Sequence, residues 1–496
     1  MMNREQMIAD IAKEVISRLQ VKLPAPKEAE SPSAGGPTAG ATNSNASAAG
    51  ETTARDGVFE TVDEAVAAAA KAQQQLAAMS LDDRGRIVAV IRRVCEERSH
   101  QLARMELDET GLGRLDHKIE KLKSVKRVLG VEAMNSGART DTTGLCLIEH
   151  APFGVIGMVL PATHSAPTLA SNAINVIASG NAAVFSPHPA GAKVAAYALQ
   201  IFNLEIRREI GLENALTTVR KPSIRSAEEI FRHEGVDLLC VTGGPAVVKA
   251  ASKSGKRVIA AGPGNPPVVV DETADLDNAA KSVIAGAAFD NNLLCIGEKE
   301  VFVVEKVANA FIAAMRRAGA FELDAAAIDR LTRAAFHFEG EGVGCGRAHL
   351  TRDLVGKDVA LLAAAAGVKV PANTDLLFGE TKMDHPFVQE EQMMPFLPVV
   401  RVRDVDAAIA AAVEAEHGYR HTAMIHSRNI DNVTKMARAM NTTLFVQNAP
   451  CGASLGLGGP GYLSFSIATP TGEGITTPLT FTRERQIVVG NGLRII

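Results

Sequence analysis

Several residue types are scarce in this chain of 496 residues, and each scarcity excludes a class of protein. Tryptophan is missing, and only 3 tyrosines occur. The 6 cysteines are widely scattered, and the closest pair, Cys295 and Cys345, is 50 positions apart. Such spacing excludes a dense disulfide scaffold and a C-x-x-C zinc ribbon. We therefore expect a reducing cytoplasmic setting, in which any cysteine with a chemical role acts alone.

The sequence also lacks an excess of positive charge and any long apolar run. The 52 Lys and Arg residues against 56 Asp and Glu give a net charge of −4, which argues against a dedicated nucleic-acid-binding protein. No stretch approaches about 18 uninterrupted apolar residues, which argues against a membrane span. The hydrophobic fraction of 46% is ample for a core, so we expect several folded domains.

The first 55 residues differ from the rest of the chain. Residues 1–20 predict a short amphipathic helix, and their charged residues exclude a signal peptide. Its apolar stripe consists of Ile8, Ile11, Val15 and Leu19. Residues 21–55 are rich in Pro, Ala, Gly and Ser and predict a flexible linker. The pattern leaves two alternatives open: the helix packs on its own chain, or it docks on another protein.

From Val58 onward, short β-rich runs alternate with helical segments, which predicts an α/β fold with mostly parallel sheets. The predicted strands are Val155–Leu160, Ala182–Phe185, Leu238–Thr242, Val258–Ala261, Val268–Val270, Val301–Val304, Val399–Val402, Thr422–His426 and Thr443–Gln447. The predicted helices include Thr168–Ala178, Ala190–Glu205, Val247–Lys253, Asp277–Ala288 and Val307–Ala318.

One strand end has the features of an anion site. The apolar run from Val236 ends in Thr242, Gly243 and Gly244, and Pro245 then occupies the first position of a helix. A strand–Gly-Gly–helix turn exposes backbone N–H groups at a helix N-terminus, which suits a pyrophosphate. The alternative is an ordinary tight turn between strand and helix.

A second glycine-rich segment, Gly456–Gly461, matches G-x-G-x-x-G only formally. No strand directly precedes it, Pro460 interrupts it, and no amphipathic helix follows. We therefore predict a loop there.

Cys295 lies in a polar connection, Phe289–Lys299, between a small-residue helix and a strand. A thiol in such a connection could be an accessible nucleophile. The alternative is an inert cysteine in the core.

Taken together, these motifs resemble the aldehyde dehydrogenases over about Val58–Ile496. The resemblance is greatest to the CoA-acylating enzymes of bacterial microcompartments, of the propanediol- and ethanolamine-utilisation type. The matching segments occur in family order: Ala151–Gly157, Phe185–Pro189, Val241–Pro245, Ala261–Pro267, Phe289–Lys299, Glu391–Pro398 and Ile467–Gly474.

The resemblance implies an aldehyde dehydrogenase-like α/β fold with three parts. Residues 56–260 would form a Rossmann-like NAD-binding domain, and residues 261–445 an α/β catalytic domain. Residues 446–496 would return to the first domain. A small β flap for oligomerisation, into a dimer or a tetramer, would use residues 139–150 and the C-terminal strand.

The resemblance also assigns roles to residues. Cys295 matches the nucleophile that forms a thiohemiacetal with the aldehyde and, after hydride loss to NAD, a thioester. Ser186 and His188 stand where other dehydrogenases place a Lys and an acidic residue, which favours NAD over NADP. The residues matched to cofactor binding are Pro161, Ser186, His188, Thr242, Gly243, Gly244 and Glu391.

Ala260 is an informative departure from the hydrolytic relatives, which carry a water-activating Glu at this position. A thiol with a pKa of about 8.5 is already partly thiolate at neutral pH, whereas water needs a base. The sequence therefore favours acyl transfer to coenzyme A over hydrolysis.

Two further positions leave alternatives open. Thr163 or His164 falls where relatives place the Asn that binds the oxyanion, and the backbone N–H of Cys295 could also suffice. His421 could assist the thiol of CoA or serve only as a structural histidine.

These assignments lead to one leading hypothesis. We expect an NAD-dependent, CoA-acylating dehydrogenase of a short-chain aldehyde such as propionaldehyde, acetaldehyde or lactaldehyde, in the lumen of a cytoplasmic microcompartment. Residues 1–20 resemble an encapsulation peptide that would bind a shell protein. The alternatives are a hydrolytic dehydrogenase that releases the free acid, and an inactive homologue kept as cargo scaffold.

Overall fold

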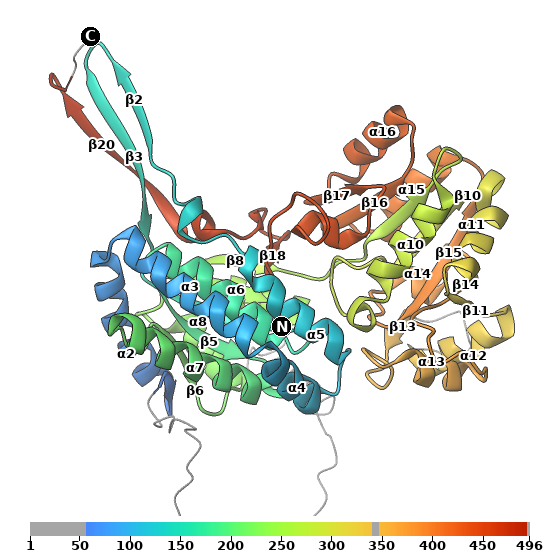
Figure 1. Cartoon of the computed structure of the whole chain (residues 1–496), viewed down its shortest axis with the longest axis horizontal. Helices are drawn as coiled ribbons and strands as arrows, with labels where there is room; N and C mark the ends of the chain where they lie inside the picture. The colour runs from blue at the N-terminus through green and yellow to red at the C-terminus, as the bar shows by residue number, and fades with distance from the viewer. Residues whose placement is uncertain (1–55, 340–346, 494–496) are drawn as a thin grey trace, which may run out of the picture. The chain divides into compact units, whose positions relative to one another are not determined.

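The computed structural model describes residues 56–339 and 347–493 (Figure 1). The predicted helix at 1–20 and the predicted linker at 21–55 lie outside the described residues. The described chain confirms an α/β fold with parallel sheets, because every strand pair in the two large sheets runs parallel. None of its helices is both long and apolar enough to cross a membrane.

A six-stranded sheet is built by the first part of the described chain. Its strands lie in the order β1 (Val58–Phe59), β6 (Leu216–Val219), β5 (Ala182–Pro187), β4 (Val155–Leu160), β7 (Leu238–Thr242) and β8 (Arg257–Ala261). The central strands β4, β5 and β7 are buried along their whole length. This explains why they appear in the sequence as continuous apolar runs rather than alternating ones.

The helices of this part cover the six-stranded sheet. They are α2 (Val62–Ala78), α3 (Leu81–Glu97), α4 (Ser99–Thr110), α5 (Leu115–Ser124), α6 (Ser165–Ala178), α7 (Ala192–Ile210), α8 (Ile224–Arg232) and α9 (Pro245–Ser252). All 14 residues of α6 are buried, because α6 lies between the sheet and α3. Helix α2 begins with a capping box, in which Thr61 and Glu64 exchange hydrogen bonds.

A seven-stranded sheet follows. Its strands lie in the order β11 (Phe321–Glu322), β14 (Leu377–Thr381), β15 (Phe396–Val402), β10 (Glu300–Val304), β9 (Pro267–Val270), β16 (Thr422–His426) and β17 (Leu444–Gln447). Its helices are α10 (Leu276–Ala287), α11 (Glu305–Arg317), α12 (Ala325–Ala335), α13 (Val359–Ala366), α14 (Pro386–Gln389), α15 (Val405–Ala415) and α16 (Ile430–Met440). The predicted strands and helices are confirmed to within a few residues at their ends.

Two short antiparallel strand pairs lie outside the two large sheets of the described chain. The hairpin of β12 (Phe336–Glu339) and β13 (Arg347–Leu350) flanks α12, and β18 (Ile467–Ala468) pairs with β19 (Gly474–Ile475). The predicted loop at Gly456–Gly461 is confirmed, since this segment follows the 3₁₀ turn η5 (Cys451–Leu455) without regular structure.

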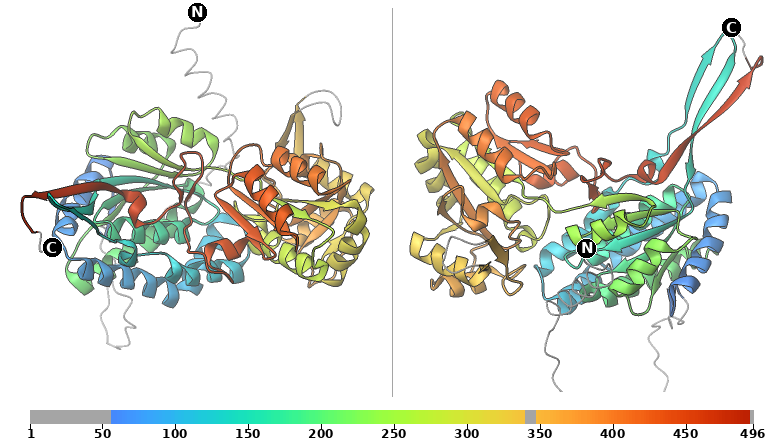
Figure 2. Two further views of the ribbon diagram at one scale, coloured as in Figure 1. Left: turned by 90° about the horizontal axis from the view of Figure 1, so that it is seen from above. Right: turned by 180° about the vertical axis from the view of Figure 1, so that it is seen from behind.

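A separate three-stranded antiparallel sheet joins segments far apart in the sequence. Strand β3 (Gly144–Pro152) pairs with β2 (Gly137–Asp141) on one side and with β20 (Thr482–Gly490) on the other. Figures 1 and 2 show this sheet extending beyond the helices that flank the six-stranded sheet. The flap is predicted from residues 139–150 and 476–496, and the strands of this sheet draw on both segments.

Candidate functional site

The predicted cofactor residues other than Glu391 lie at the carboxyl ends of strands of the six-stranded sheet, whereas Glu391 lies between α14 and β15. Pro161 directly follows β4, and Ser186 is buried near the end of β5. His188 is exposed just beyond β5, where its N–H bonds Leu160 O at 3.0 Å and its Nδ1 accepts from Ala190 N–H at 3.1 Å. In parallel α/β sheets this edge is where ligands bind.

The turn after β7 has the open geometry that the sequence predicts. Pro245 begins α9, and a β-carbon placed on Gly244 would meet no atom within 4 Å. Gly243 N–H bonds Ala261 O at 3.1 Å, whereas the hydroxyl of Thr242 is taken by Ser466 Oγ at 2.7 Å. Gly244, at the N-terminus of α9, is therefore the part of this turn that is open to an anion, because the Gly243 N–H and the Thr242 hydroxyl already have partners. These residues fit a dinucleotide phosphate.

Cys295 is partly exposed and lines a small pocket. Most of the pocket wall is apolar, and its polar members are Lys121, Ser124, His164 and Ser464. The apolar lining residues are Phe289, Leu294, Ile296, Leu455, Leu457, Leu463, Phe465 and Ile467. The pocket therefore brings Cys295, which precedes β10, together with His164 from the N-terminus of α6.

The chain approaches Cys295 through three consecutive residues with left-handed backbone. Asp290, Asn291 and Asn292 have φ angles of 50°, 56° and 63°. Asp and Asn tolerate this region better than other residues with a side chain, because their short polar side chains bond locally. Asn291 Nδ2 donates to Gly356 O at 3.0 Å and to Asp358 Oδ1 at 2.8 Å. Asn292 Nδ2 donates at 2.9 Å to the carbonyl oxygens of residues 287 and 298.

The buried residue Lys299 donates hydrogen bonds to the same loop. The ammonium of Lys299 donates to Asn292 O at 2.8 Å, to Leu294 O at 3.2 Å and to the Asn292 side-chain oxygen. These bonds fold the loop of residues 292–295 around one cation. The segment that presents the thiol is therefore rigidly specified, although the sequence suggested only a polar connection.

The thiol of Cys295 is neutral in this setting. Desolvation, followed by the neighbouring Glu391 carboxylate, raises the pKa of Cys295 to about 12, and Lys299 opposes this rise. Desolvation likewise raises the pKa of Glu391 to about 7, while Lys299 and a hydrogen bond from Gly264 N–H lower it. Glu391 thus lies close enough to influence the thiol electrostatically.

The structure distinguishes the two oxyanion candidates by position. His164 is one of the residues that line the Cys295 pocket, and its ring lies 5.8 Å from that of Phe465. Thr163 Oγ1 lies 2.9 Å from His164 Nδ1, so the hydroxyl orients the imidazole. Burial and the cations Lys121 and Lys118 hold the pKa of His164 well below its usual value. The imidazole is therefore neutral and can offer an N–H to the pocket.

His421 is buried beside the nucleophile loop. A β-carbon on Gly264 would lie 2.7 Å from Cys295 O and 2.9 Å from His421 Cγ, so the three residues meet at this glycine. His421 Nδ1 lies 2.8 Å from Thr422 Oγ1, and within the described chain its Nε2 has no hydrogen-bond partner. Burial, with Lys299, lowers the pKa of His421 to about 4, so its ring is neutral.

Ala260 lies in β8 and is fully buried. Its N–H donates to Thr471 Oγ1 at 2.9 Å. Its methyl group can neither accept nor deliver a proton. This strand end therefore supplies no base for activating water.

Sequence reasoning missed a cluster of four buried charges next to this pocket. Lys118 and Lys121 on α5 pair with Glu106 on α4 and with Asp290 before Cys295. The polar residues of segment 115–124 predict a surface helix. This pattern gives no indication that the side chains of both lysines are only about 1% exposed. The only available signal was the run of polar residues at Asp290–Asn292.

Comparison with known proteins agrees with this geometry. The sequence model of the aldehyde dehydrogenase family matches residues 42–322. The chain is 47% identical over 442 residues to acetaldehyde dehydrogenase (acetylating) EutE of Salmonella typhimurium, which covers 89% of this chain and 94% of that relative.

Two solved structures are similar over nearly the same range. One is a propionaldehyde dehydrogenase from the Clostridium phytofermentans fucose utilisation bacterial microcompartment, with 41% identity and a TM-score of 0.85. The other is a Rhodopseudomonas palustris propionaldehyde dehydrogenase with bound CoA and an acylated cysteine, with 42% identity and a TM-score of 0.85. Each match covers 89% of this chain and 100% of the other. The predicted aldehyde dehydrogenase-like fold is therefore confirmed.

The raised pKa of Cys295 predicts an unusual pH dependence of alkylation. With a pKa of about 12, the thiolate fraction rises about tenfold per pH unit over the whole range from about pH 7 to 9.5, whereas an ordinary thiol levels off above its pKa of about 8.5. The rate of iodoacetamide addition to Cys295, followed by peptide mass spectrometry, should rise without a plateau.

The variant Glu391→Gln should alkylate faster than wild type at each pH, since removing a nearby negative charge lowers the thiol pKa. Glu390→Gln, which changes the adjacent carboxylate, is the matched control. A plateau near pH 8.5 in the wild type would contradict a desolvated thiol.

Proposed function

This chain belongs to the aldehyde dehydrogenase family, and we propose that it catalyses the NAD-dependent, CoA-acylating oxidation of a short-chain aldehyde. One observation carries the proposal: Cys295 faces a small, mostly apolar pocket, and position 260 holds an Ala that supplies no base for water. The names of the similar proteins, an acetylating acetaldehyde dehydrogenase and propionaldehyde dehydrogenases, support this reaction class.

Cys295 is the proposed nucleophile. Its sulfur adds to the aldehyde carbon and gives a thiohemiacetal, whose oxygen carries the developing negative charge. When bound, NAD accepts the hydride that leaves this carbon, and the products are a thioester on Cys295, NADH and one proton. Transfer of the acyl group to the CoA thiol restores the Cys295 thiol.

His164 is the proposed side-chain donor to the oxyanion, beside the backbone N–H of Cys295. It lines the pocket, and the cations behind it keep the ring neutral. Thr163 then has an orienting role, because its hydroxyl contacts the other ring nitrogen. With Nδ1 bonded to Thr163, Nε2 is the nitrogen left to carry the catalytic proton.

NAD would lie along the carboxyl edge of the six-stranded sheet. Gly244 and the N-terminal turn of α9 would bind its pyrophosphate through backbone N–H groups, with Gly243, Pro161 and the end of β5 lining the same edge. Ser186 and His188 would face the adenosine ribose, and Glu391 the nicotinamide ribose. The absence of a Lys at Ser186 favours NAD over NADP.

The three domains follow from the same assignment. Residues 56–260 form the proposed NAD-binding domain, residues 261–445 the catalytic domain, and residues 446–496 return to the first. The strands support this division, since those of the six-stranded sheet end at Ala261 and those of the seven-stranded sheet begin at Pro267. The exposed flap of β2, β3 and β20, on which Val488 is 71% exposed, is the proposed surface for a dimer or tetramer.

CoA acts as a co-substrate in the proposal and enters the space that NADH vacates, which makes the reaction ping-pong. His421 is placed to assist its thiol, because the ring lies beside Gly264 and Cys295 with Nε2 unpaired. A neutral imidazole with a lowered pKa can accept a thiol proton transiently and return it. Exchange of one thioester for another is nearly balanced, so the reaction is reversible.

The first test compares NADH formation from propionaldehyde with and without CoA. A general base contributes about 10² to 10⁴ in rate, so hydrolysis without one is expected to be at least about 100-fold slower than CoA transfer. Without CoA, we expect a burst of one NADH per active site and an acylated Cys295 by mass spectrometry. The variant Cys295→Ala should show neither, and His421→Ala should keep the burst and slow the CoA-dependent phase.

The alternatives give different results in the same assay. Rapid turnover to the free acid without CoA would establish the hydrolytic reaction. A wild-type enzyme that forms no NADH from propionaldehyde, acetaldehyde or lactaldehyde would favour the scaffold.

A second prediction separates His164 from Thr163. His164→Ala should lower kcat by about 10² to 10³, the range found when one oxyanion donor is removed. Thr163→Val should cost only about tenfold, because the imidazole stays in the pocket and loses its orienting partner. Steady-state kinetics would check both, and a larger loss in Thr163→Val would assign the donor to the hydroxyl.

Residues 1–20 are the proposed encapsulation segment, and the partner is a microcompartment shell protein in the cell's cytoplasm. The amphipathic stripe Ile8, Ile11, Val15 and Leu19 suits a helix-in-groove contact, and the microcompartment origin of a similar protein supports it. Deleting residues 1–20 should leave NADH formation unchanged and abolish co-purification with shells. Ile11→Glu with Val15→Glu should do the same, whereas Lys13→Glu, on the polar face, should not.

A further inference from the structure

The four buried charges beside the Cys295 pocket balance one another. Glu106 and Asp290 supply two carboxylates, Lys118 and Lys121 supply two ammonium groups, and each side chain is at most 1% exposed. Lys118 Nζ lies 3.0 Å from Glu106 Oε1 and 3.8 Å from Asp290 Oδ2, and Lys121 pairs with Asp290. We call Glu106, Lys118, Lys121 and Asp290 the buried quartet.

On one side, the quartet holds the backbone around His164. Lys118 Nζ and Lys121 Nζ each donate to Thr163 O at 3.4 Å. Glu106 Oε2 accepts from Ala166 N–H at 3.1 Å, in the first turn of α6. The His164 side chain does not cap the N-terminus of α6, and the Glu106 carboxylate accepts a hydrogen bond from this helix end instead. The backbone is therefore fixed on both sides of His164, whose ring lines the pocket.

On the other side, the quartet holds the start of the nucleophile loop. Asp290 is the first of the three left-handed residues, and its Oδ1 accepts from Arg114 N–H at 2.8 Å while Oδ2 faces the two lysines. Its own N–H donates to His117 Nδ1 at 2.8 Å, and the His117 ring stacks on Phe289 at 4.5 Å. One face of α5 therefore contacts the loop at Asp290, five residues before Cys295.

Stability alone does not account for such a quartet. Removing four charges from water carries a desolvation penalty that often exceeds the attraction between them, and apolar replacements are commonly neutral or stabilising. A quartet that joins two catalytic segments has a second use, since it fixes the distance between an oxyanion donor and a nucleophile.

We propose that Lys121 and Asp290 are positioning residues that hold His164 at its working distance from Cys295. Lys121 hydrogen-bonds both segments, Asp290 on one side and Thr163 O on the other. Lys118 also donates to Thr163 O but lies 3.8 Å from Asp290. The inference rests on the proposed function and names residues that act through His164 and Cys295. Lys121 also lines the pocket, whereas Asp290 does not, so Asp290→Asn tests positioning without changing the pocket wall.

The test compares Lys121→Met, Asp290→Asn and the double variant. Each single change leaves an unpaired buried charge, so Tm falls; the double change removes both charges, so Tm recovers. A purely structural pair would recover kcat together with Tm. Positioning predicts that kcat for propionaldehyde oxidation stays about 100-fold below wild type in the double variant, with the Kd of NAD unchanged.

Hydrogen exchange gives a readout that does not depend on activity. Peptides covering residues 161–167 and 289–296 should exchange at least about tenfold faster in both single variants and in the double variant. Unchanged exchange in either segment, or recovery of exchange and kcat with Tm, would overturn the positioning pair. An inactive wild type would overturn the proposed function instead, and exchange would still decide whether the pair joins the two segments.

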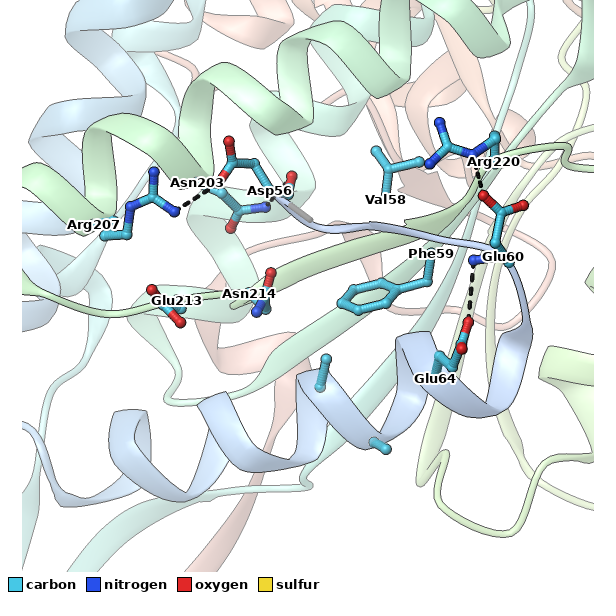
Figure 3. A pocket seen from close by; sticks show the side chains of 12 residues that line it. Asp56, Val58, Phe59, Glu60, Glu64, Asn203, Arg207, Glu213, Asn214 and Arg220 are labelled. Carbon is cyan, nitrogen blue, oxygen red and sulfur yellow. Dashed lines mark hydrogen bonds and ion pairs between the residues drawn. The ribbon is translucent and has the colours of Figure 1, made fainter. Parts of the chain in front are cut away.

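The matched control is Asp56→Asn. Asp56 is 3% exposed and pairs with Arg207 at 2.7 Å, in a hollow between β1, α2 and α7 that shares no lining residue with the Cys295 pocket (Figure 3). This variant removes a buried, paired carboxylate without touching either segment. It should lower Tm and leave kcat and the exchange of both peptides as in wild type.

Discussion

The left-handed turn before Cys295 is the constraint on which the rest of the site depends. Three successive residues with positive φ cannot persist unless their surroundings hold them. Asp290 is held by α5, Asn291 by the Gly356–Asp358 segment, and Asn292 by the chain on both sides of it. Three separate parts of the fold therefore converge on one short loop, and the thiol takes its position from all of them.

Desolvation then sets the chemistry of the thiol. In a mostly apolar pocket beside Glu391, the neutral form is favoured, which lowers the reactivity of Cys295 toward alkylating agents and oxidants. The same low dielectric strengthens the N–H groups that face a developing oxyanion. A pocket that suppresses the resting thiolate is thus also one in which a charged transition state gains most from fixed dipoles.

Whether the acyl group is hydrolysed or transferred to CoA depends on whether the site contains a base that activates water. A thioester is hydrolysed slowly unless a base activates water, and the buried methyl group of Ala260 offers none. A thiol needs less help, because part of it is ionised at neutral pH. The missing carboxylate at position 260 therefore favours retention of the thioester bond energy in acyl-CoA.

The sequence by itself determined the α/β class, most strand positions and the chemistry, because buried parallel strands are continuous apolar runs and motifs such as Thr242–Gly244 are local. It also singled out Cys295 and Ala260. Only the tertiary structure decided that Lys118, Lys121 and Lys299 are buried, that His164 rather than Thr163 lines the pocket, and that Thr242 is bonded to Ser466. Burial and pairing depend on segments far apart in the chain, which no local pattern encodes.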